Sequence, residues 1–276
     1  MSISVLIMTW NEEANLSACL ESLSWSDDIV VLDSFSTDRT AEIARAAGAR
    51  VIKRKYDSED RQRMFGLTKI KFKYPWVYTP DADEVTPEDL RDEMLAIAAD
   101  PTTPEAMFKA RYKNMFLGKW IRYSSLYPTW ITRMVRPDRV RFERQVHSVC
   151  VPDGPVGHLK SHFIHYSFNK GIEAWYDKHN RYSSVEARLA ASRAVTKIDW
   201  ADVFSTQPDA RRRGLKSLSR RLPFRPTLRF FYMYVLRGGF LDGWPGYVYC
   251  RLISGYEFMI VLKTAELRRR ERGLQI

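Results

Sequence analysis

Short apolar runs alternate with amphipathic segments through the N-terminal third of the chain. The runs have the length and residue types of buried strands, and the segments between them repeat apolar residues at helical spacing. The expected strands span residues 3–8, 29–32, 50–54 and 76–79, and the expected helices span residues 16–23, 39–47, 60–72 and 87–99. Strands that alternate with helices build a mainly parallel sheet with right-handed crossovers. The sequence therefore predicts a Rossmann-like α/β fold with helices on both faces of the sheet.

The pattern changes after Asp100. Further strands are expected at residues 106–112, 130–135, 139–151 and 159–168, with an aromatic loop at 114–128 and a helix at 171–192. The interval 201–213 is polar and contains Pro208, which indicates a boundary. We therefore expect an α/β domain over residues 1–208 and a basic, aromatic helical extension over residues 209–276.

The excess positive charge of the chain lies in its last quarter. The formal net charge is +11, from 44 basic and 33 acidic side chains, and residues 210–276 hold 15 of the basic and 4 of the acidic ones. The other residues therefore hold 29 of each sign, a net charge of zero. Such asymmetry indicates a polyanionic partner, which could be anionic lipid, nucleic acid or another acidic surface.

Basic clusters flank two aromatic and aliphatic segments in this last quarter. The clusters lie within residues 211–229 and 268–272, and the aromatic segments lie at 230–236 and 240–262. This composition is typical of helices that lie on an anionic membrane surface, with Tyr and Trp at the lipid headgroups. Alternatively, the helices pack on the α/β domain and the arginines are only solvated. We expect no nucleic-acid partner, because that alternative leaves the acidic residues described below without a role.

Cysteine usage and the N-terminus indicate the compartment. Cys19, Cys150 and Cys250 are far apart and odd in number, so no disulfide framework or zinc spacing is visible, and a reducing cytoplasm fits best. Ser2–Thr9 has the pattern of a strand and not that of a signal peptide. The apolar runs stay shorter than the ~18 residues that a simple membrane span needs.

Acidic residues follow three of the expected strands. Glu12 comes after the first strand, Asp33 after the second, and Asp81 and Asp83 after the fourth. A parallel sheet places the carboxyl ends of its strands on one edge, so these side chains are expected to meet at a nucleotide pocket. Carboxylate oxygens suit Mg²⁺ or Mn²⁺. Taken singly, each acid could instead cap a helix.

The residue types in this pocket allow roles to be assigned. Asp33 could accept from a base or a ribose, Asp81 could serve ribose or metal, and Asp83 could ligate the metal directly. Three basic residues precede the fourth strand, and one of them could reach a diphosphate; they are Arg61, Arg63 and Lys69. We take Arg63 as the candidate, with a solvated helix face as the alternative.

Three segments resemble the opening motifs of family 2 glycosyltransferases, and most of all those of its bacterial lipopolysaccharide-core glucosyltransferase group. They are Ile7–Leu16, Val30–Thr40 and Asp81–Glu84. The resemblance implies a GT-A fold, a nucleotide-diphosphate sugar donor such as a UDP-hexose, a divalent metal and inversion at the anomeric carbon. By position it implies Thr9, Asn11 and Glu12 in the nucleotide pocket, Asp33 on the base, Asp81 on ribose and metal, and Asp83 on the metal.

The resemblance and the basic extension together predict an enzyme of cell-envelope polysaccharide or lipopolysaccharide biosynthesis. Its acceptor would be a lipid-linked glycan, either lipopolysaccharide core or a polyprenyl-diphosphate oligosaccharide. The expected location is the cytoplasmic face of the inner membrane, as a peripheral or monotopic protein. The alternative is a catalytically inactive protein that binds a sugar nucleotide.

The catalytic base is the open question in the sequence. Residues 141–148 resemble a Val-His-Glu segment of the family, but Ser148 stands where Glu is usual, and Thr129 stands where Asp is frequent. A serine is not a base at neutral pH without help, so Glu143 and His147 are the nearest candidates. Glu143 could equally pair with a neighbouring arginine on the surface.

Three histidines follow, with spacings of four and three residues. His158, His162 and His165 would form a metal face on a helix, but the surrounding residues favour a loop and a strand. One histidine that completes the Asp83 metal shell is the better hypothesis. The resemblance implies His165 for this position, with His147 as the alternative.

Overall fold

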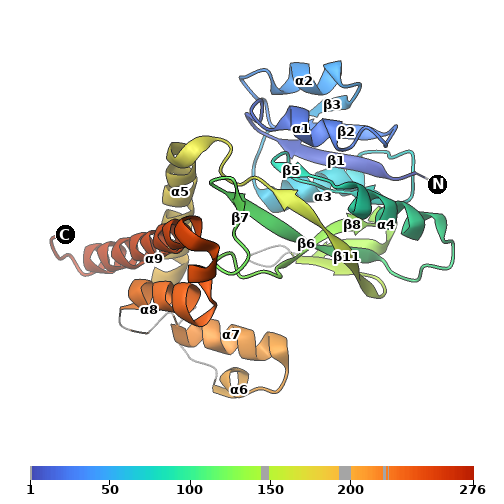
Figure 1. The fold of residues 1–276 in the computed structure, drawn as a ribbon. Helices are drawn as coiled ribbons and strands as arrows, with labels where there is room; N and C mark the ends of the chain where they lie inside the picture. The colour runs from blue at the N-terminus through green and yellow to red at the C-terminus, as the bar shows by residue number, and fades with distance from the viewer. Residues whose placement is uncertain (1, 144–148, 193–199, 220–221, 223) are drawn as a thin grey trace. The chain divides into compact units, whose positions relative to one another are not determined.

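A computed structural model describes residues 2–143, 149–192, 200–219, 222 and 224–276 of the chain (Figure 1). Contacts divide the chain into two compact units. The α/β unit consists of Met1–Met115 and Tyr127–Asn169, and the helical unit consists of Phe116–Leu126 and Lys170–Ile276. This division differs from the boundary expected after residue 208, because a long helix and a segment between two strands group with the C-terminal helices.

The first half of the sheet in the α/β unit is parallel, as expected. β3 (Arg50–Lys53), β2 (Ile29–Asp33), β1 (Ser4–Thr9) and β4 (Val77–Tyr78) lie side by side in that order and all pair parallel. β1, β2 and β4 are almost wholly buried, because helices pack on both faces of the sheet, and this explains the apolar runs in these strands; β3 at the edge keeps exposed Arg50 and Lys53 at its ends. The predicted α/β class is confirmed.

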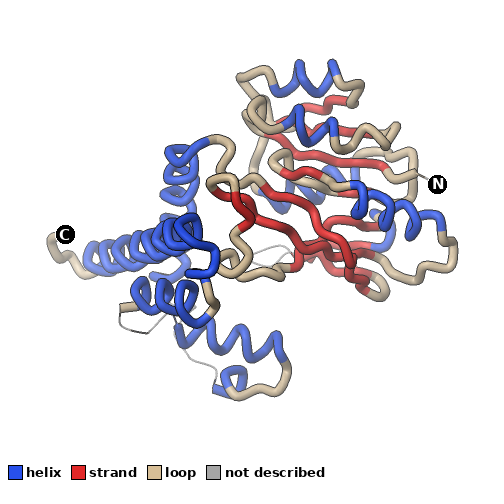
Figure 2. The backbone as a smooth tube through the Cα atoms, viewed as in Figure 1, coloured by secondary structure: helices blue, strands red, loops and turns tan. Residues whose placement is uncertain are grey.

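The second half of the sheet is mixed. It continues through β8 (Trp130–Val135), β6 (Met107–Phe116), β11 (Val156–His165) and β5 (Glu84–Val85). β8 runs antiparallel to both β4 and β6, β11 is parallel to β6, and β5 is antiparallel to β11. Figure 2 traces these strands in red. The sheet as a whole is therefore mixed and mostly parallel.

Helices cover both faces of this sheet because alternate strand residues point to opposite sides. On one face, Val5 and Ile7 of β1 pack with α1 (Leu16–Glu21), α2 (Thr40–Ala46) and α4 (Glu88–Ala99). On the other face, Leu6 packs with α3 (Glu59–Lys69). The carboxyl ends of β1, β2 and β4 lie at one edge of the sheet, because these strands are parallel, and a loop follows each of them.

Two expected strands need correction, and one strand was missed. The strand expected at 139–151 is a pair of antiparallel strands, β9 (Val140–Glu143) and β10 (Val149–Pro152), preceded by the 3₁₀ turn η1 (Pro137–Arg139). The strand expected at 159–168 is β11, which begins and ends three residues earlier. The short strand β5 was not expected, because two residues carry no periodic pattern.

The helical unit is built around two long helices that pack on each other, α5 (Gly171–Ala191) and α9 (Gly243–Glu271). The shorter elements are β7 (Lys119–Trp120), α6 (Trp200–Val203), α7 (Pro208–Ser219), α8 (Arg225–Phe231), the π-helical turn η3 (Tyr232–Leu236) and the 3₁₀ turn η4 (Gly239–Asp242). Within the part of the chain that the structure describes, no helix combines the length and apolarity that crossing a bilayer requires.

A buried carboxylate fastens the Phe116–Leu126 segment inside the helical unit. Asp242 is 2% exposed and accepts from the backbone N–H groups of Arg122 (3.1 Å), Tyr123 (3.0 Å) and Ser124 (2.7 Å). It also accepts from the Ser124 hydroxyl at 2.7 Å. A buried charge is tolerated when several donors satisfy it, and here four donors from one loop do so.

Candidate functional site

The ends of three parallel strands meet at one edge of the α/β unit. Thr9 at the end of β1 pairs with Asp33 at the end of β2, and Met8 forms a parallel bridge with Asp81 beyond β4. The structure therefore places the expected residues of the first, second and fourth strands next to one another. This placement follows from the strand order β2-β1-β4 together with the parallel direction of these strands; the alternating pattern predicted the parallel direction, and the structure adds the order.

Asp33 organises the loop that follows its own strand. Its side chain is fully buried and accepts from the Thr9 hydroxyl (3.2 Å), the Ser36 N–H (3.0 Å) and the Ser36 hydroxyl (2.5 Å). Asn11 has a left-handed backbone with φ of 53°, and its Oδ1 accepts from the Thr37 N–H at 2.9 Å. These bonds hold the loops after β1 and β2 against each other.

Glu12 belongs to the same pair of loops. Its backbone N–H donates to Thr40 Oγ1 at 2.7 Å, and its carboxylate accepts from Asn15 Nδ2 at 2.9 Å. Thr9, Asn11, Glu12 and Asp33 are thus brought together, as the sequence analysis expected, and the bonds Thr9–Asp33, Asn11–Thr37 and Glu12–Thr40 join one loop to the other. Their assignment to nucleotide binding stays a prediction.

Two exposed aromatic rings accompany these loops. Trp10 is 55% exposed and Phe35 is 54% exposed, and the Lys53 ammonium lies 5.7 Å from the centre of the Phe35 ring. Phe35 has φ of 59°, a left-handed backbone conformation that is rare for a bulky residue, and its ring is exposed to solvent. Sequence reasoning missed both rings, although a large apolar residue inside a polar turn was a visible signal.

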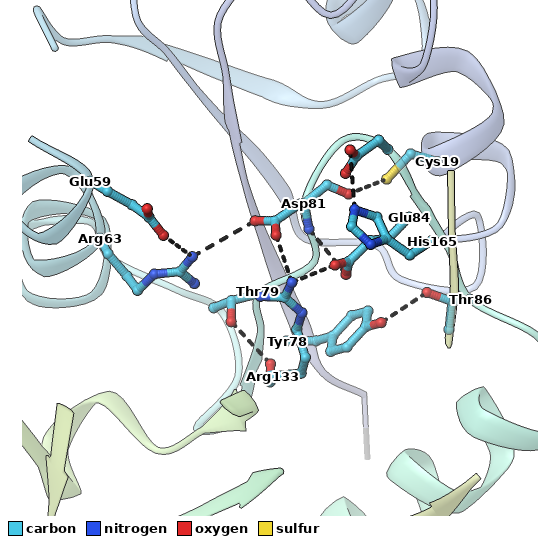
Figure 3. A network of polar contacts seen from close by, with 11 residues as sticks. Cys19, Glu59, Arg63, Tyr78, Thr79, Asp81, Glu84, Thr86, Arg133 and His165 are labelled. Carbon is cyan, nitrogen blue, oxygen red and sulfur yellow. Dashed lines mark hydrogen bonds and ion pairs between the residues drawn. The ribbon is translucent and has the colours of Figure 1, made fainter. Parts of the chain in front are cut away.

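Asp81 lies between two arginines (Figure 3). Arg133 Nη2 is 2.6 Å from Asp81 Oδ2, and Arg63 Nη2 is 3.7 Å from Asp81 Oδ1. Desolvation opposes ionisation of Asp81, but the charges of Arg133 and Arg63 outweigh it and lower the pKa of Asp81 to about 2. Asp81 therefore stays a carboxylate throughout the physiological pH range.

Arg133 also contacts Glu84, and both side chains are almost completely buried, at 2% and 1% exposure. Glu84 accepts a further bond from the backbone N–H of Asp81 at 3.2 Å. Burial raises the pKa of Glu84, and the Arg133 charge acts against that rise. Sequence reasoning assigned no role to Arg133, although an arginine inside an apolar strand usually indicates a buried ionic partner.

Asp83 and His165 form the part of the site that suits a metal ion. His165 Nε2 lies 3.2 Å from Asp83 Oδ2, and one ligand atom each from Asp83, Glu84 and His165 lie within 4.8 Å of one another. Burial would lower the pKa of His165, but the hydrogen bond and charge of Asp83 raise it overall. The edge of His165 also faces the Tyr112 ring, 5.4 Å between centres, which fixes its orientation.

The donor set fits a divalent cation. One carboxylate and one imidazole are acceptable to Mn²⁺, which prefers oxygen ligands and leaves further positions for water and phosphate. Asp83 and His165 are the residues that would hold the ion, because Glu84 is already engaged by Arg133. The expected metal ligands Asp83 and His165 are therefore brought together, while Asp81, which was also expected on the metal, is not a member of this group, and neither are Glu12 and Asp33.

The remaining candidates lie elsewhere or outside the described residues. His147 falls within residues 144–148, and the side chain of Glu143 at the end of β9 is likewise not described. His158 lies edge-on to the Trp130 ring at 4.7 Å, and neither His158 nor His162 joins the metal group found among the described residues. The Asp83 partner is His165, as the single-histidine hypothesis predicted.

A cavity of about 230 Å³ adjoins this network on the side of Arg63 and Arg133. Its wall contains polar side chains from α3 and β8 together with Thr79, which follows β4; the lining residues include Glu59, Asp60, Arg63, Thr79, Thr132 and Arg133. Arg63, which is partly exposed, is the cation of this wall that can turn to a negatively charged group, since Arg133 is buried and paired with Asp81 and Glu84.

Comparison with known proteins identifies the family. The family model for glycosyl transferase family 2 matches residues 4–162, more than half of the chain. The chain belongs to glycosyltransferase family 2. The family 2 match covers the whole strand edge described above, together with Asp81, Asp83 and β8, and this is an inverting family. The fold is accordingly α/β and GT-A-like, with C-terminal helices.

Relatives of similar length match almost the whole family 2 chain. An uncharacterised glycosyltransferase of Rickettsia typhi is 27% identical over 288 residues, covering 99% of this chain and 89% of the relative. The lipopolysaccharide core biosynthesis glycosyltransferase LpsC of Rhizobium meliloti is 25% identical over 273 residues, covering 95% and 92%.

Solved structures give weaker similarities. Glucosyl-3-phosphoglycerate synthase from Mycobacterium tuberculosis, in complex with Mn²⁺, UDP and glucosyl-3-phosphoglycerate, has a TM-score of 0.35 at 24% identity and covers 45% of this chain and 47% of that chain. S. aureus TarS 1–349 has a TM-score of 0.43 at 14% identity, covering 98% and 92%. At these TM-scores neither similarity supports a conclusion about this chain.

Proposed function

We propose that this family 2 enzyme is a metal-dependent, inverting hexosyltransferase that uses a UDP-linked sugar donor. The observation that carries the proposal is the Asp83–His165 pair beside the ionised Asp81, at the edge where the loops after β1 and β2 meet. A cation at Asp83 and His165 would stabilise the charge of the departing diphosphate. The loops after β1 and β2 would bind the nucleotide.

The protein residues around that cation have separable tasks. Asp81 is held as a carboxylate by Arg133 and can accept hydrogen bonds from ribose hydroxyls. Arg63 lines the cavity and already contacts a carboxylate, so it can turn to a phosphate oxygen of the donor. Asp33 and Asn11 keep the nucleotide loops ordered before the donor arrives, which reduces the entropy lost on binding.

Transfer also requires a group that takes the proton of the acceptor hydroxyl. Such a group typically contributes ~10²–10⁴-fold to the rate. Glu143, the last residue of β9, and His147, which lies between β9 and β10 in the sequence, stay the candidates. The acceptor hydroxyl would attack from the face opposite the diphosphate, in accordance with inversion.

For the acceptor we propose a lipid-linked glycan, used in lipopolysaccharide core or related cell-envelope synthesis. The name of the Rhizobium relative supports this assignment, as does the charge of the last quarter of the chain. An acceptor of this kind is reached at a membrane, and we propose the cytoplasmic face of the inner membrane as the place of action.

The metal site can be tested with a substitution that keeps its shape. UDP and Mn²⁺ together should stabilise the wild-type chain in a thermal-shift assay, by ~2.7 kcal/mol at 100 times the Kd. Asp83→Asn should lose the Mn²⁺-dependent part of this shift and should lose sugar transfer. Asp92→Asn, which changes an exposed acid on α4, is the matched control and should behave as wild type. Transfer by Asp83→Asn at the wild-type rate would refute the proposed site.

A further inference from the structure

One face of the segment from α8 to the start of α9 is apolar and exposed. In α8 and η3 the exposed apolar residues recur at i, i+3, i+4, i+7 and i+8; they are Leu228 (46%), Phe231 (54%), Tyr232 (41%), Val235 (49%) and Leu236 (77%). Three more exposed apolar residues follow in η4 and at the start of α9; they are Phe240 (51%), Leu241 (55%) and Trp244 (67%). We call these eight residues the apolar ridge.

The opposite face of the same segment is packed inside the helical unit. Met233 is 1% exposed, and the rings of Phe230 and Tyr234 stack at 5.2 Å. Both rings also contact Tyr247 of α9, at 5.9 and 5.7 Å between centres. Figure 1 shows α8 beside α9. The inner face alone therefore anchors this segment in the helical unit. The residues of the ridge are not needed for that packing.

A helix that is apolar on both faces is normally buried on both. Here the outer face of α8 and η3 contributes five large exposed side chains at helical spacing, and three more follow within the next eight residues, which is more than the scattered apolar residues of an ordinary surface. A set of this size indicates a partner that is itself apolar at the point of contact.

The charges around the ridge indicate that the partner is negatively charged. Between residues 228 and 244 the basic residues are Arg229 and Arg237, and the single acid, Asp242, is 2% exposed and bonded to the loop at 122–124. No exposed carboxylate therefore stands within the ridge segment, all of which the structure describes. Residues 210–276 as a whole hold 15 basic and 4 acidic side chains.

We propose that the apolar ridge inserts into the headgroup region of an anionic lipid bilayer, with α8 and η3 lying in the plane of the membrane. Interfacial helices bury their apolar face ~5–10 Å into that region and gain affinity from anionic lipid. Tyr232 and Trp244 suit the headgroup level, and Arg229 and Arg237 can extend to lipid phosphates. Binding at the bilayer surface does not require a membrane-spanning helix.

The test measures vesicle binding by the full chain, with neither donor nor acceptor present. Binding to vesicles of 7:3 phosphatidylcholine and phosphatidylglycerol should exceed binding to pure phosphatidylcholine by at least tenfold, and 0.5 M KCl should weaken it. The double substitution Val235→Ser and Leu236→Ser should lower the partition coefficient by about tenfold, equivalent to ~1.4 kcal/mol. Both residues are exposed, so the fold should persist, as circular dichroism can verify.

Val185→Ser is the matched control, since Val185 is 50% exposed on α5 of the same unit and lies outside the ridge. It should bind vesicles within twofold of wild type. The proposal is overturned by absent or charge-independent vesicle binding, or by an equal loss in the Val185 variant. It is also overturned if the chain forms a dimer that the double substitution dissociates, because a second copy would then cover the ridge. Since no transfer is measured, these outcomes are distinct from failure of the proposed function.

Discussion

Replacing Arg133 by methionine tests whether the buried ion pair holds the site together. The substitution keeps an unbranched side chain about as long as the aliphatic part of arginine, and it removes the guanidinium group with its charge. Glu84 would then be a buried carboxylate without its cation, while Asp81, whose side chain is 43% exposed, could be solvated by water. The expected loss of stability therefore comes mainly from Glu84.

Removing one partner of a buried ion pair destabilises a protein by about 3–5 kcal/mol. For a domain of this size that loss corresponds to a fall in Tm of roughly 6–20 °C. The loss should depend on pH, because burial already raises the pKa of Glu84 and removal of Arg133 raises it further. A folded state that binds a proton more tightly than the unfolded state loses stability as pH rises. The difference from wild type should therefore be larger at pH 8 than at pH 5.5.

Urea denaturation followed by tryptophan fluorescence at both pH values gives the two free energies of unfolding. Arg91→Met is the control, because Arg91 forms an exposed pair with Asp92 at 2.8 Å, and such pairs contribute ~0–1 kcal/mol. Adding Glu84→Gln to Arg133→Met should recover part of the loss. A loss below about 1 kcal/mol at pH 8, or one that is the same at both pH values, would refute this account of the pair.

Three further predictions concern other parts of the molecule. Mn²⁺ affinity should fall as pH falls through the pKa of His165, which Asp83 raises above 6.5, since a proton competes with the metal; Mn²⁺ titrations at several pH values measure this. Asp242→Asn should reduce the free energy of unfolding by about 1–3 kcal/mol, because an amide cannot accept from all four donors. Gly246→Ala should destabilise by about 1–3 kcal/mol, since its Cβ would lie 2.3 Å from the Gly239 carbonyl oxygen.

Each of these predictions has a result that contradicts it. Mn²⁺ affinity that is flat between pH 6 and 8 would remove His165 from the metal site. Ser124→Ala, which removes one of the four bonds, should be milder than Asp242→Asn, and equal losses would count against the satisfied carboxylate. Gly255→Ala on the same helix meets nothing within 4 Å and should stabilise by ~0.5–1 kcal/mol, so a loss there would invalidate the comparison with Gly246.

The strand edge was predictable because its signal is local. Each apolar run marks its own strand, and parallel strands place the acids that follow them, such as Asp33 and Asp81, on one edge of the sheet. The order β2-β1-β4, which makes them neighbours, is information that the structure adds. The metal pair Asp83 and His165 was predictable only through the family resemblance, because 82 residues separate the two side chains. Neither the composition of the chain nor the periodicity of its apolar residues shows which residues 82 positions apart will be in contact.

The buried network was not predictable for a different reason. Arg133 stands in an apolar strand, and its partners Asp81 and Glu84 belong to a loop and to the two-residue strand β5. Pairing of β8 with β4 sets this contact, and strand order in the mixed half of the sheet has no local signal. The exposed face of the ridge is likewise a property of packing, since both faces of α8 and η3 are apolar in sequence.

The bond between Asp242 and the loop at 122–124 also constrains how the chain can be assembled. During synthesis Ser124 leaves the ribosome 118 residues before its acceptor, and at ~5–20 residues per second the loop waits about 6–24 s for it. Until then the N–H groups of Arg122, Tyr123 and Ser124 must donate their hydrogen bonds to water or to a chaperone. A chain cut after residue 208 would leave them permanently without that acceptor, so the C-terminal helices cannot be removed without loosening a segment synthesised long before them.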